Sequence, residues 1–242
     1  GVRLDANRNV AGTVNLTNDG AVGTLDQQRL PLRAMRGQLG GSLTAMRITD
    51  VLIDVGNAGR FTGSGSVQRG PEEKGLGTAE FALHTDRFDL HDVHGSMKPT
   101  KIAGDIKVAN TKDTQTLDVN LADAGLRLVA QAALADNVLT VRDARLSAGR
   151  SSVRVTGNAS LKDRKPFKAN AIVSRFNPAD FGTFPQADIN AEVNAAGALV
   201  PQWKVAADFA VRPSRLFGQP LSGRGKLDAD ATHVHDVDAT LA

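Results

Sequence analysis

The side chains that could do chemistry in this chain are few and scattered. Its five histidines are His84, His91, His94, His233 and His235. The spacing of His91 and His94 would point their side chains to opposite faces of a strand. His233 and His235 are two residues apart and would share one face, which is better geometry for a metal site. We interpret all five as solvent-facing turn histidines and expect no specific metal requirement.

No set of residues in the sequence forms a recognisable catalytic site. The serines lack a nucleophile elbow and a nearby His–Asp pair. The paired carboxylates Glu72 and Glu73 lie in a loop-like stretch, and the segments Gly63-Ser64-Gly65 and Gly223-Arg224-Gly225 do not lead into helices as phosphate loops do. We therefore expect that the protein is not an enzyme and needs no cofactor. Glycines in such strands serve bulges and bends.

Composition excludes several further classes of site. The chain has no cysteine, so it has no disulfides, thiolate nucleophile or zinc–sulfur centre, and this fits an oxidising compartment outside the cytoplasm. Its formal charge is +3, and only 4% of its residues are aromatic. Scattered basic residues with few rings do not make a nucleic-acid groove, so we expect no nucleic-acid partner.

The dominant feature is a recurring strand-like phrase in which apolar and polar residues alternate. Alternation with period two is typical of β-strands with one apolar and one polar face. We count roughly sixteen strand candidates and few helix signals, namely single turns near 26–30 and 177–181. The sequence therefore predicts an all-β protein. The clearest copies of the phrase are Val10–Leu16, Arg60–Val67, Lys101–Val108, Val153–Leu161 and Leu221–Ala229.

Repetition of this kind predicts an elongated, curled β-sheet of mostly sequential strands, a taco-like groove with an aliphatic interior. Small apolar residues and few rings would fill a two-sheet sandwich poorly, although composition alone does not exclude one. Expected turns include 135–137, 110–113 and 228–231, with a loop at 69–75. The residues expected to line the groove are Val119, Val141, Val155, Ala171, Ile189, Val193, Val205 and Phe209.

We expect one domain over residues 1–242, with a possible subdivision near 110–135 that the pattern does not assign. No stretch approaches the roughly 20 apolar residues of a membrane span. The chain starts without Met and stops inside a strand-like phrase, so we expect a fragment of a longer protein.

Four segments carry a resemblance to a known family, namely Gly23–Arg33, Phe176–Phe181, Pro201–Trp203 and Ser214–Gly225. All four resemble phrases of the TamB family, the inner-membrane component of the translocation and assembly module. The later run, 176–225, also resembles the wider AsmA-like group of repeating β-groove proteins. The resemblance implies a middle or C-terminal periplasmic fragment of a protein anchored in the inner membrane. It also implies lipid-compatible β-sheets, phospholipid transport, and a partner barrel in the outer membrane.

Three hypotheses follow from the residues and the resemblance. The first is a periplasmic β-groove that shields or conducts lipid acyl chains between the two membranes, in support of outer-membrane biogenesis. The second is a scaffold or chaperone whose sheet edges pair with strands of β-barrel or autotransporter clients during assembly or secretion. The third is an adhesin-like β-solenoid, which the lack of a tight period disfavours.

Overall fold

The computed structural model describes residues 1–5, 9–70, 77–111 and 113–241. It contains sixteen strands, and its helical content is three 3₁₀ turns, η1 (Leu25–Gln27), η2 (Gly56–Ala58) and η3 (Pro178–Asp180). The chain divides into two compact units, residues 1–124 and 125–242. This division falls inside the stretch 110–135, where the sequence did not assign a boundary.

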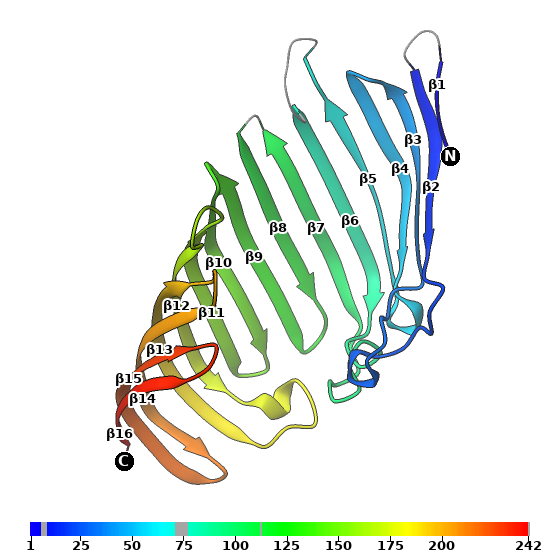
Figure 1. The fold of residues 1–242 in the computed structure, drawn as a ribbon. Coiled ribbons are helices and arrows are strands. Elements are labelled where there is room, and N and C mark those ends of the chain that lie inside the picture. Colours follow the sequence, from blue (N-terminus) through cyan, green and yellow to red (C-terminus); the bar gives the residue numbers. More distant parts are fainter. Residues whose placement is uncertain (6–8, 71–76, 112, 242) are drawn as a thin grey trace. The chain divides into compact units, whose positions relative to one another are not determined.

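Unit 1 is a meander of eight strands, in which each strand pairs antiparallel with the next in the chain (Figure 1). The strands are β1 (Val2–Leu4), β2 (Asn9–Thr17), β3 (Ala34–Ser42), β4 (Ala45–Asp54), β5 (Arg60–Gln68), β6 (Thr78–Phe88), β7 (Ile102–Thr111) and β8 (Thr114–Ala122).

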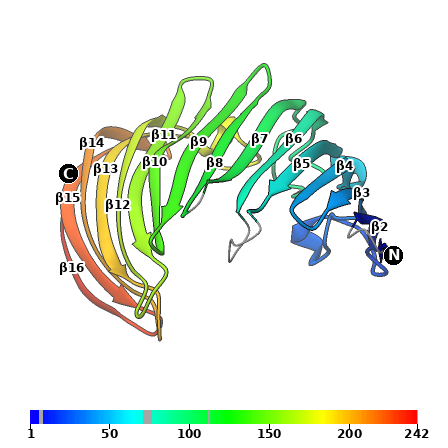
Figure 2. The ribbon, with the colours of Figure 1, turned by 90° about the horizontal axis from the view of Figure 1, so that it is seen from above.

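Unit 2 repeats the same plan, again with every strand antiparallel to its neighbour in sequence. Several of its strands bow along their length (Figure 2). The strands are β9 (Leu126–Ala135), β10 (Val138–Ala148), β11 (Ser151–Ser160), β12 (Pro166–Phe176), β13 (Ala187–Ala198), β14 (Lys204–Leu216), β15 (Gln219–Asp230) and β16 (Val234–Leu241).

The sequential order of the strands follows from local chemistry. Many neighbouring strands are joined by short turns, in which Asn, Asp and Gly accept left-handed backbone angles. Asp136 and Asn137, for example, have φ of 50° and 61° in the turn between β9 and β10. The expected turn at 135–137 is thus confirmed, whereas β15 continues through Asp230 and the turn expected at 228–231 begins later. The loop expected at 69–75 lies mostly outside the described residues.

Bulges interrupt the even-numbered strands β4, β6, β10, β12 and β14. At two of them a non-glycine residue has positive φ, Asp50 at 50° and Arg175 at 48°. An extra residue in one strand bends it and increases its twist. Bulges therefore account for local bending of the strands in both units.

The longer connections of unit 1 pack together at the opposite end of its strands, at the lower end in Figure 1. The Leu25 amide donates to the Val93 carbonyl at 2.8 Å, and the Asp89 amide donates to the Ala58 carbonyl at 2.7 Å. In unit 2 the connection after β12 contains η3. The Asn177 side chain accepts a hydrogen bond from the Ala179 amide at 3.2 Å and caps this turn, as its sequence predicts.

The all-β class and the run of about sixteen mostly sequential strands are confirmed. Within each unit the described residues form a single layer, so a two-sheet sandwich is not the architecture of either unit. Each sheet is open, and the curl that we expected is present only as bending at bulges.

Candidate functional site

Strand register sorts the side chains of each unit onto two chemically different faces. In unit 2, Val155 lies opposite Ala171, Ala171 opposite Val193, and Val193 opposite Phe209. Side chains that are directly opposite in a ladder share a face. These four residues therefore form one row across β11 to β14, on what we call the apolar face of unit 2.

The structure places all eight expected lining residues on apolar faces. Three more expected residues lie on the same face as this row. Val141 lies opposite Gly157, Ile189 opposite Phe176, and Val205 opposite Gly197, and each of these partners belongs to the apolar face. Val119 belongs to the apolar face of unit 1, where it lies opposite Ile106. Each of the eight is partly buried, so each still presents surface to solvent.

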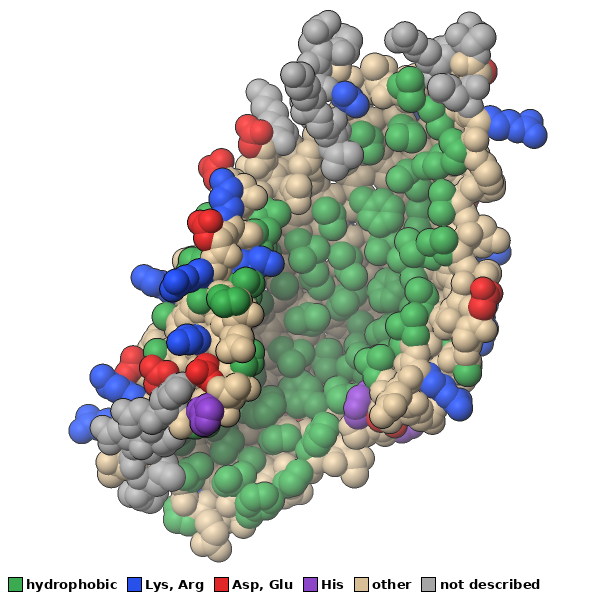
Figure 3. Space-filling view, in the orientation of Figure 1, with side chains coloured by type: hydrophobic (Ala, Val, Ile, Leu, Met, Phe, Trp, Pro, Cys, Tyr) green, Lys and Arg blue, Asp and Glu red, His purple; other side chains and the backbone are tan. Residues whose placement is uncertain are grey.

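The apolar face of unit 1 is as extensive, and most of its residues were not among those expected to line a groove. Leu83 lies opposite Ile106 and Phe81 opposite Val108, and Ile53 lies opposite Phe61, whose ring centroid is 5.1 Å from that of Phe88. In Figure 3 hydrophobic side chains form a continuous field over these strands. The same alternation that identified Val119 could have identified them.

Charged side chains are absent from the described apolar-face positions of both units, β1 and β16 aside. No Lys, Arg, Asp or Glu occupies a described apolar-face position of β2–β8 or β9–β15; in these strands the charges lie at alternate positions or at bulges. On the polar face of unit 2, Arg154 Nε donates to Asp143 Oδ1 at 2.6 Å, and Lys226 Nζ lies 3.7 Å from Asp208 Oδ1. Because these exposed ion pairs contribute little to stability, we attribute the sorting to solvation of the two faces.

Within each unit, no second layer covers the apolar face among the described residues. Few hydrophobic side chains are fully buried, and several large ones on the apolar face of unit 1, including Val14, Val108 and Leu117, are exposed. A soluble protein normally buries such a surface or offers it to a ligand or partner. The fully buried hydrophobic residues are Val10, Val51, Ala58, Ile102, Ala133, Ala148, Phe181 and Ala229.

Glycines let neighbouring strands approach closely on these faces. A Cβ built on Gly65 would lie 2.7 Å from Cδ2 of Phe81, and one built on Gly197 would lie 1.9 Å from the Lys204 carbonyl oxygen. The glycine-centred phrases of the sequence are therefore packing features of strands. Gly63, Gly65, Gly223 and Gly225 lie within β5 and β15, and the described bulges of β4, β6, β10, β12 and β14 fall at other residue types, so the interpretation of these glycines as bulge formers was wrong.

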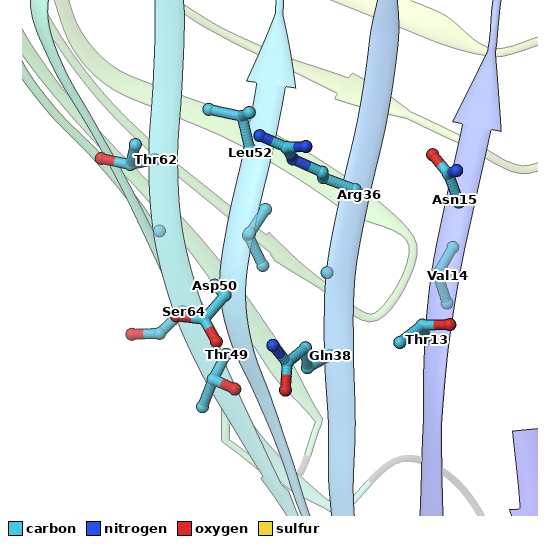
Figure 4. A pocket seen from close by; sticks show the side chains of 13 residues that line it. Thr13, Val14, Asn15, Arg36, Gln38, Thr49, Asp50, Leu52, Thr62 and Ser64 are labelled. Carbon is cyan, nitrogen blue, oxygen red and sulfur yellow. The ribbon is translucent and has the colours of Figure 1, made fainter.

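A depression with a volume of about 960 Å³ lies on the polar face of unit 1, over β2 to β5 (Figure 4). It is lined mainly by hydroxyl and amide side chains such as Asn15, Gln38, Thr49 and Thr62, with Arg36 beside Leu52. It lies next to the bulge at Asp50, which bends β4. Such side chains also suit a solvated sheet face, so we do not assign this depression a ligand.

The histidines do not come together. His84 lies on the polar face, where its Nδ1 is 2.8 Å from Asp105 Oδ1 and its Nε2 is 3.1 Å from Asp86 Oδ1. Hydrogen bonds to Asp105 and then Asp86 raise the pKa of His84. His91 and His94 lie in the loop between β6 and β7, as expected of turn histidines, whereas His84 lies within β6, so its interpretation as a turn residue was wrong. His233 lies in the turn before β16, and the side chain of His235 lies outside the described residues.

Within the described part of the chain, no group of three or more His, Asp or Glu side chains could hold a metal ion. The described helices are all too short and too polar to cross a membrane.

The loop ends of the sheets are held by polar contacts, which are part-buried in unit 2 and exposed in unit 1. In unit 2, the buried Ser151 hydroxyl contacts the Asp180 carboxylate at 2.5 Å and accepts from the Asn177 amide at 2.9 Å. In unit 1, the Gly95 amide donates to Asp26 Oδ1 at 2.9 Å, and this hydrogen bond lowers the pKa of Asp26. Both networks tie a connecting loop to the end of a sheet, and neither contains a nucleophile–base pair.

Comparison of the chain with protein-family models, with curated proteins and with solved structures gives no significant match.

Proposed function

We propose that the protein binds the acyl chains of lipids on its apolar faces, shielding or conducting them without chemical conversion. The observation that carries this proposal is a continuous apolar face on each sheet that is partly exposed, free of charge and uncovered within its unit. In unit 2 it includes the row Val155, Ala171, Val193 and Phe209.

The energetics favour a long hydrocarbon ligand. Each buried methylene contributes about 0.8 kcal/mol, so a chain of about sixteen carbons could gain on the order of 10 kcal/mol before ordering costs. The apolar face offers no charged side chain to a head group. Binding should therefore tolerate different head groups, because the polar end of the lipid can remain in water.

The cellular setting is part of the same proposal. The four phrases that resemble the TamB and AsmA-like proteins, together with the absence of cysteine, support a periplasmic segment of a protein anchored in the inner membrane. In that setting the apolar faces would carry phospholipid between the inner and outer membranes. An outer-membrane barrel partner could meet the longer protein outside this segment.

The test is to purify the protein, extract it with organic solvent and identify bound lipids by mass spectrometry. Val155→Arg places a charge on the apolar face, and Thr156→Arg places the same charge on the polar face one residue later. We expect Val155→Arg to stay folded, because the guanidinium can reach water from an uncovered face, and to lose bound lipid. Thr156→Arg should retain it.

Lipid loading of Val155→Arg equal to that of Thr156→Arg would refute the proposal. Val119→Arg extends the test to unit 1. Unfolding of both apolar-face variants, with Thr156→Arg folded, would indicate a packed core and would also contradict an open lipid-binding face, since a buried unpaired charge costs several kcal/mol.

One observation favours a second candidate function, pairing with client strands. β1 covers β2 only from Val10 to Gly12, and Gly1 bonds to Thr13. Among the described residues, no strand pairs with residues 14–17 of β2 on the edge that faces away from β3. An unpaired strand edge can accept an added strand. Crosslinking of client β-strands to this edge would support the second candidate.

A further inference from the structure

We propose that one end of unit 2 docks on the surface of an anionic lipid bilayer. The docking surface, which we call the interfacial patch, consists of two connections, residues 161–165 between β11 and β12 and residues 199–203 between β13 and β14. Both lie at the same end of the strands of unit 2 (Figure 2). The proposal rests on residues other than the apolar-face row, so it goes beyond the proposed lipid binding.

The turns of the interfacial patch expose apolar side chains. Leu161 is 45% exposed, Leu199 51%, Val200 38% and Trp203 45%. Turns in water are normally built from Gly, Asn, Asp and Ser. Here the four apolar side chains stand beyond the strand ends, where no neighbouring strand covers them. An exposed apolar cluster of this kind marks an interaction surface.

Backbone hydrogen bonds hold the two connections of the interfacial patch together. The Leu199 and Val200 amides both donate to the Arg164 carbonyl at 3.1 Å. The Leu161 amide donates to the Asn137 carbonyl of the neighbouring turn at 2.7 Å. The apolar side chains of separate turns are thus presented on one small, backbone-tied surface. A flat membrane surface can contact all of them at once.

The interfacial patch and its surroundings carry more cations than anions. Lys162, Arg164 and Lys165 lie in the patch and Lys204 follows it, against the carboxylates Asp163, Asp136 and Asp230, the last of which lies opposite Lys204, so four cations and three anions give a local charge of +1. None of the four cations forms a salt bridge with any described residue. Unpaired Lys and Arg beside exposed apolar groups suit anionic head groups.

Trp203 adds an anchor of the type found at membrane interfaces. An indole ring buries its apolar surface among the acyl chains and keeps its N–H near the head groups. Phe217 offers a built-in comparison, because it lies beyond the other end of β14 and is 70% exposed. It is a large aromatic residue that directly follows β14, whereas Trp203 directly precedes it, and it lies outside the patch.

The experiment uses vesicles and the natural fluorescence of the protein, since Trp203 is its one tryptophan. The protein is mixed with vesicles of phosphatidylcholine alone or with about 30% phosphatidylglycerol. We expect co-sedimentation with the anionic vesicles, a blue shift of tryptophan emission, and quenching by lipids brominated on their acyl chains. Raising salt toward about 1 M should weaken binding, because the Debye length falls to about 3 Å.

Two patch variants and one control decide the assignment. The double change Leu161→Ser and Leu199→Ser, and the triple change Lys162→Glu, Arg164→Glu and Lys165→Glu, should each reduce vesicle binding by about tenfold or more. Phe217→Ser should bind vesicles as the unchanged protein does. All these residues are exposed, and circular dichroism checks that the variants remain folded.

Several results would overturn the proposal. They are binding that does not depend on anionic lipid, equal losses in Phe217→Ser and the patch variants, and no binding to any vesicle. Val155→Arg separates this inference from the proposed function. If that variant loses extracted lipid but still sediments with vesicles, docking does not depend on lipid binding by the apolar face. If the patch variants lose vesicle binding but keep extracted lipid, lipid binding by the apolar face does not depend on docking.

Discussion

Val193 lies directly opposite Phe209 in the ladder of β13 and β14, and both side chains project from the apolar face of unit 2. Asn194, the next residue, lies opposite Asp208 on the polar face. A single step along the strand therefore moves a side chain from a hydrocarbon surface to a solvated one. An acyl chain that crosses the strands at Val193 would touch one of these positions and not the other.

The cysteine-free sequence allows this difference to be measured with an environment-sensitive thiol dye. Attached after Val193→Cys, the dye should shift its emission to the blue when lipid is added, because hydrocarbon displaces water around it. Attached after Asn194→Cys, it should show little change. Equal shifts at the two positions would contradict binding confined to the apolar face.

Close strand approach at Gly197 makes this position intolerant of a side chain. The Cβ of Gly197→Ala would meet the backbone oxygen of Lys204 at 1.9 Å and Phe167 Cε1 at 3.0 Å. We expect a loss of about 1–3 kcal/mol in the free energy of unfolding, as for other overpacked sites. Chemical denaturation measures this loss.

Gly40→Ala is the matched control, because a Cβ there meets no atom within 4 Å. Its unfolding free energy should change by less than about 0.5 kcal/mol. Equal losses in the two variants would show that the approach of Gly197 to Lys204 is not the cause.

The Ser151 hydroxyl should stabilise the connection that carries η3. Ser151 is 1% exposed, and its hydroxyl contacts both the Asn177 amide and the Asp180 carboxylate. Ser151→Ala leaves these groups without that partner, so we expect a loss of about 1–3 kcal/mol in unfolding free energy. Ser152→Ala, one residue later on the other face, should have little effect. Thermal denaturation of both variants tests the difference.

His84 should titrate above its ordinary pKa of 6.5, because it bonds first to Asp105 and then to Asp86. A raised folded pKa means that the charged imidazole stabilises the fold fully below pH 6.5, and that this contribution is lost as pH rises through the folded value. Asp105→Asn removes the larger cause. It should lower the His84 pKa toward 6.5, as measured by NMR titration of the ring protons. An unchanged pKa in Asp105→Asn would rule out that carboxylate as the cause.

The alternation of residues by itself determined the all-β class, the sequential strands and the face on which each expected lining residue lies. Val155, Val193 and Phe209 could each be assigned to the apolar side of its own strand, because side chains two apart in a strand must point the same way. The turn at 136–137 and the capped turn at Asn177 followed equally from local preferences. These features depend on interactions between residues close in the chain.

The tertiary structure decided what depends on residues far apart in sequence. The bulges at Asp50 and Arg175 shift the register in the middle of a strand, and local alternation does not reveal such shifts because the cross-strand ladder fixes them. The sequence likewise could not join Leu199 to Arg164. The two turns of the interfacial patch are separate in the chain, and only strand pairing brings them to one surface.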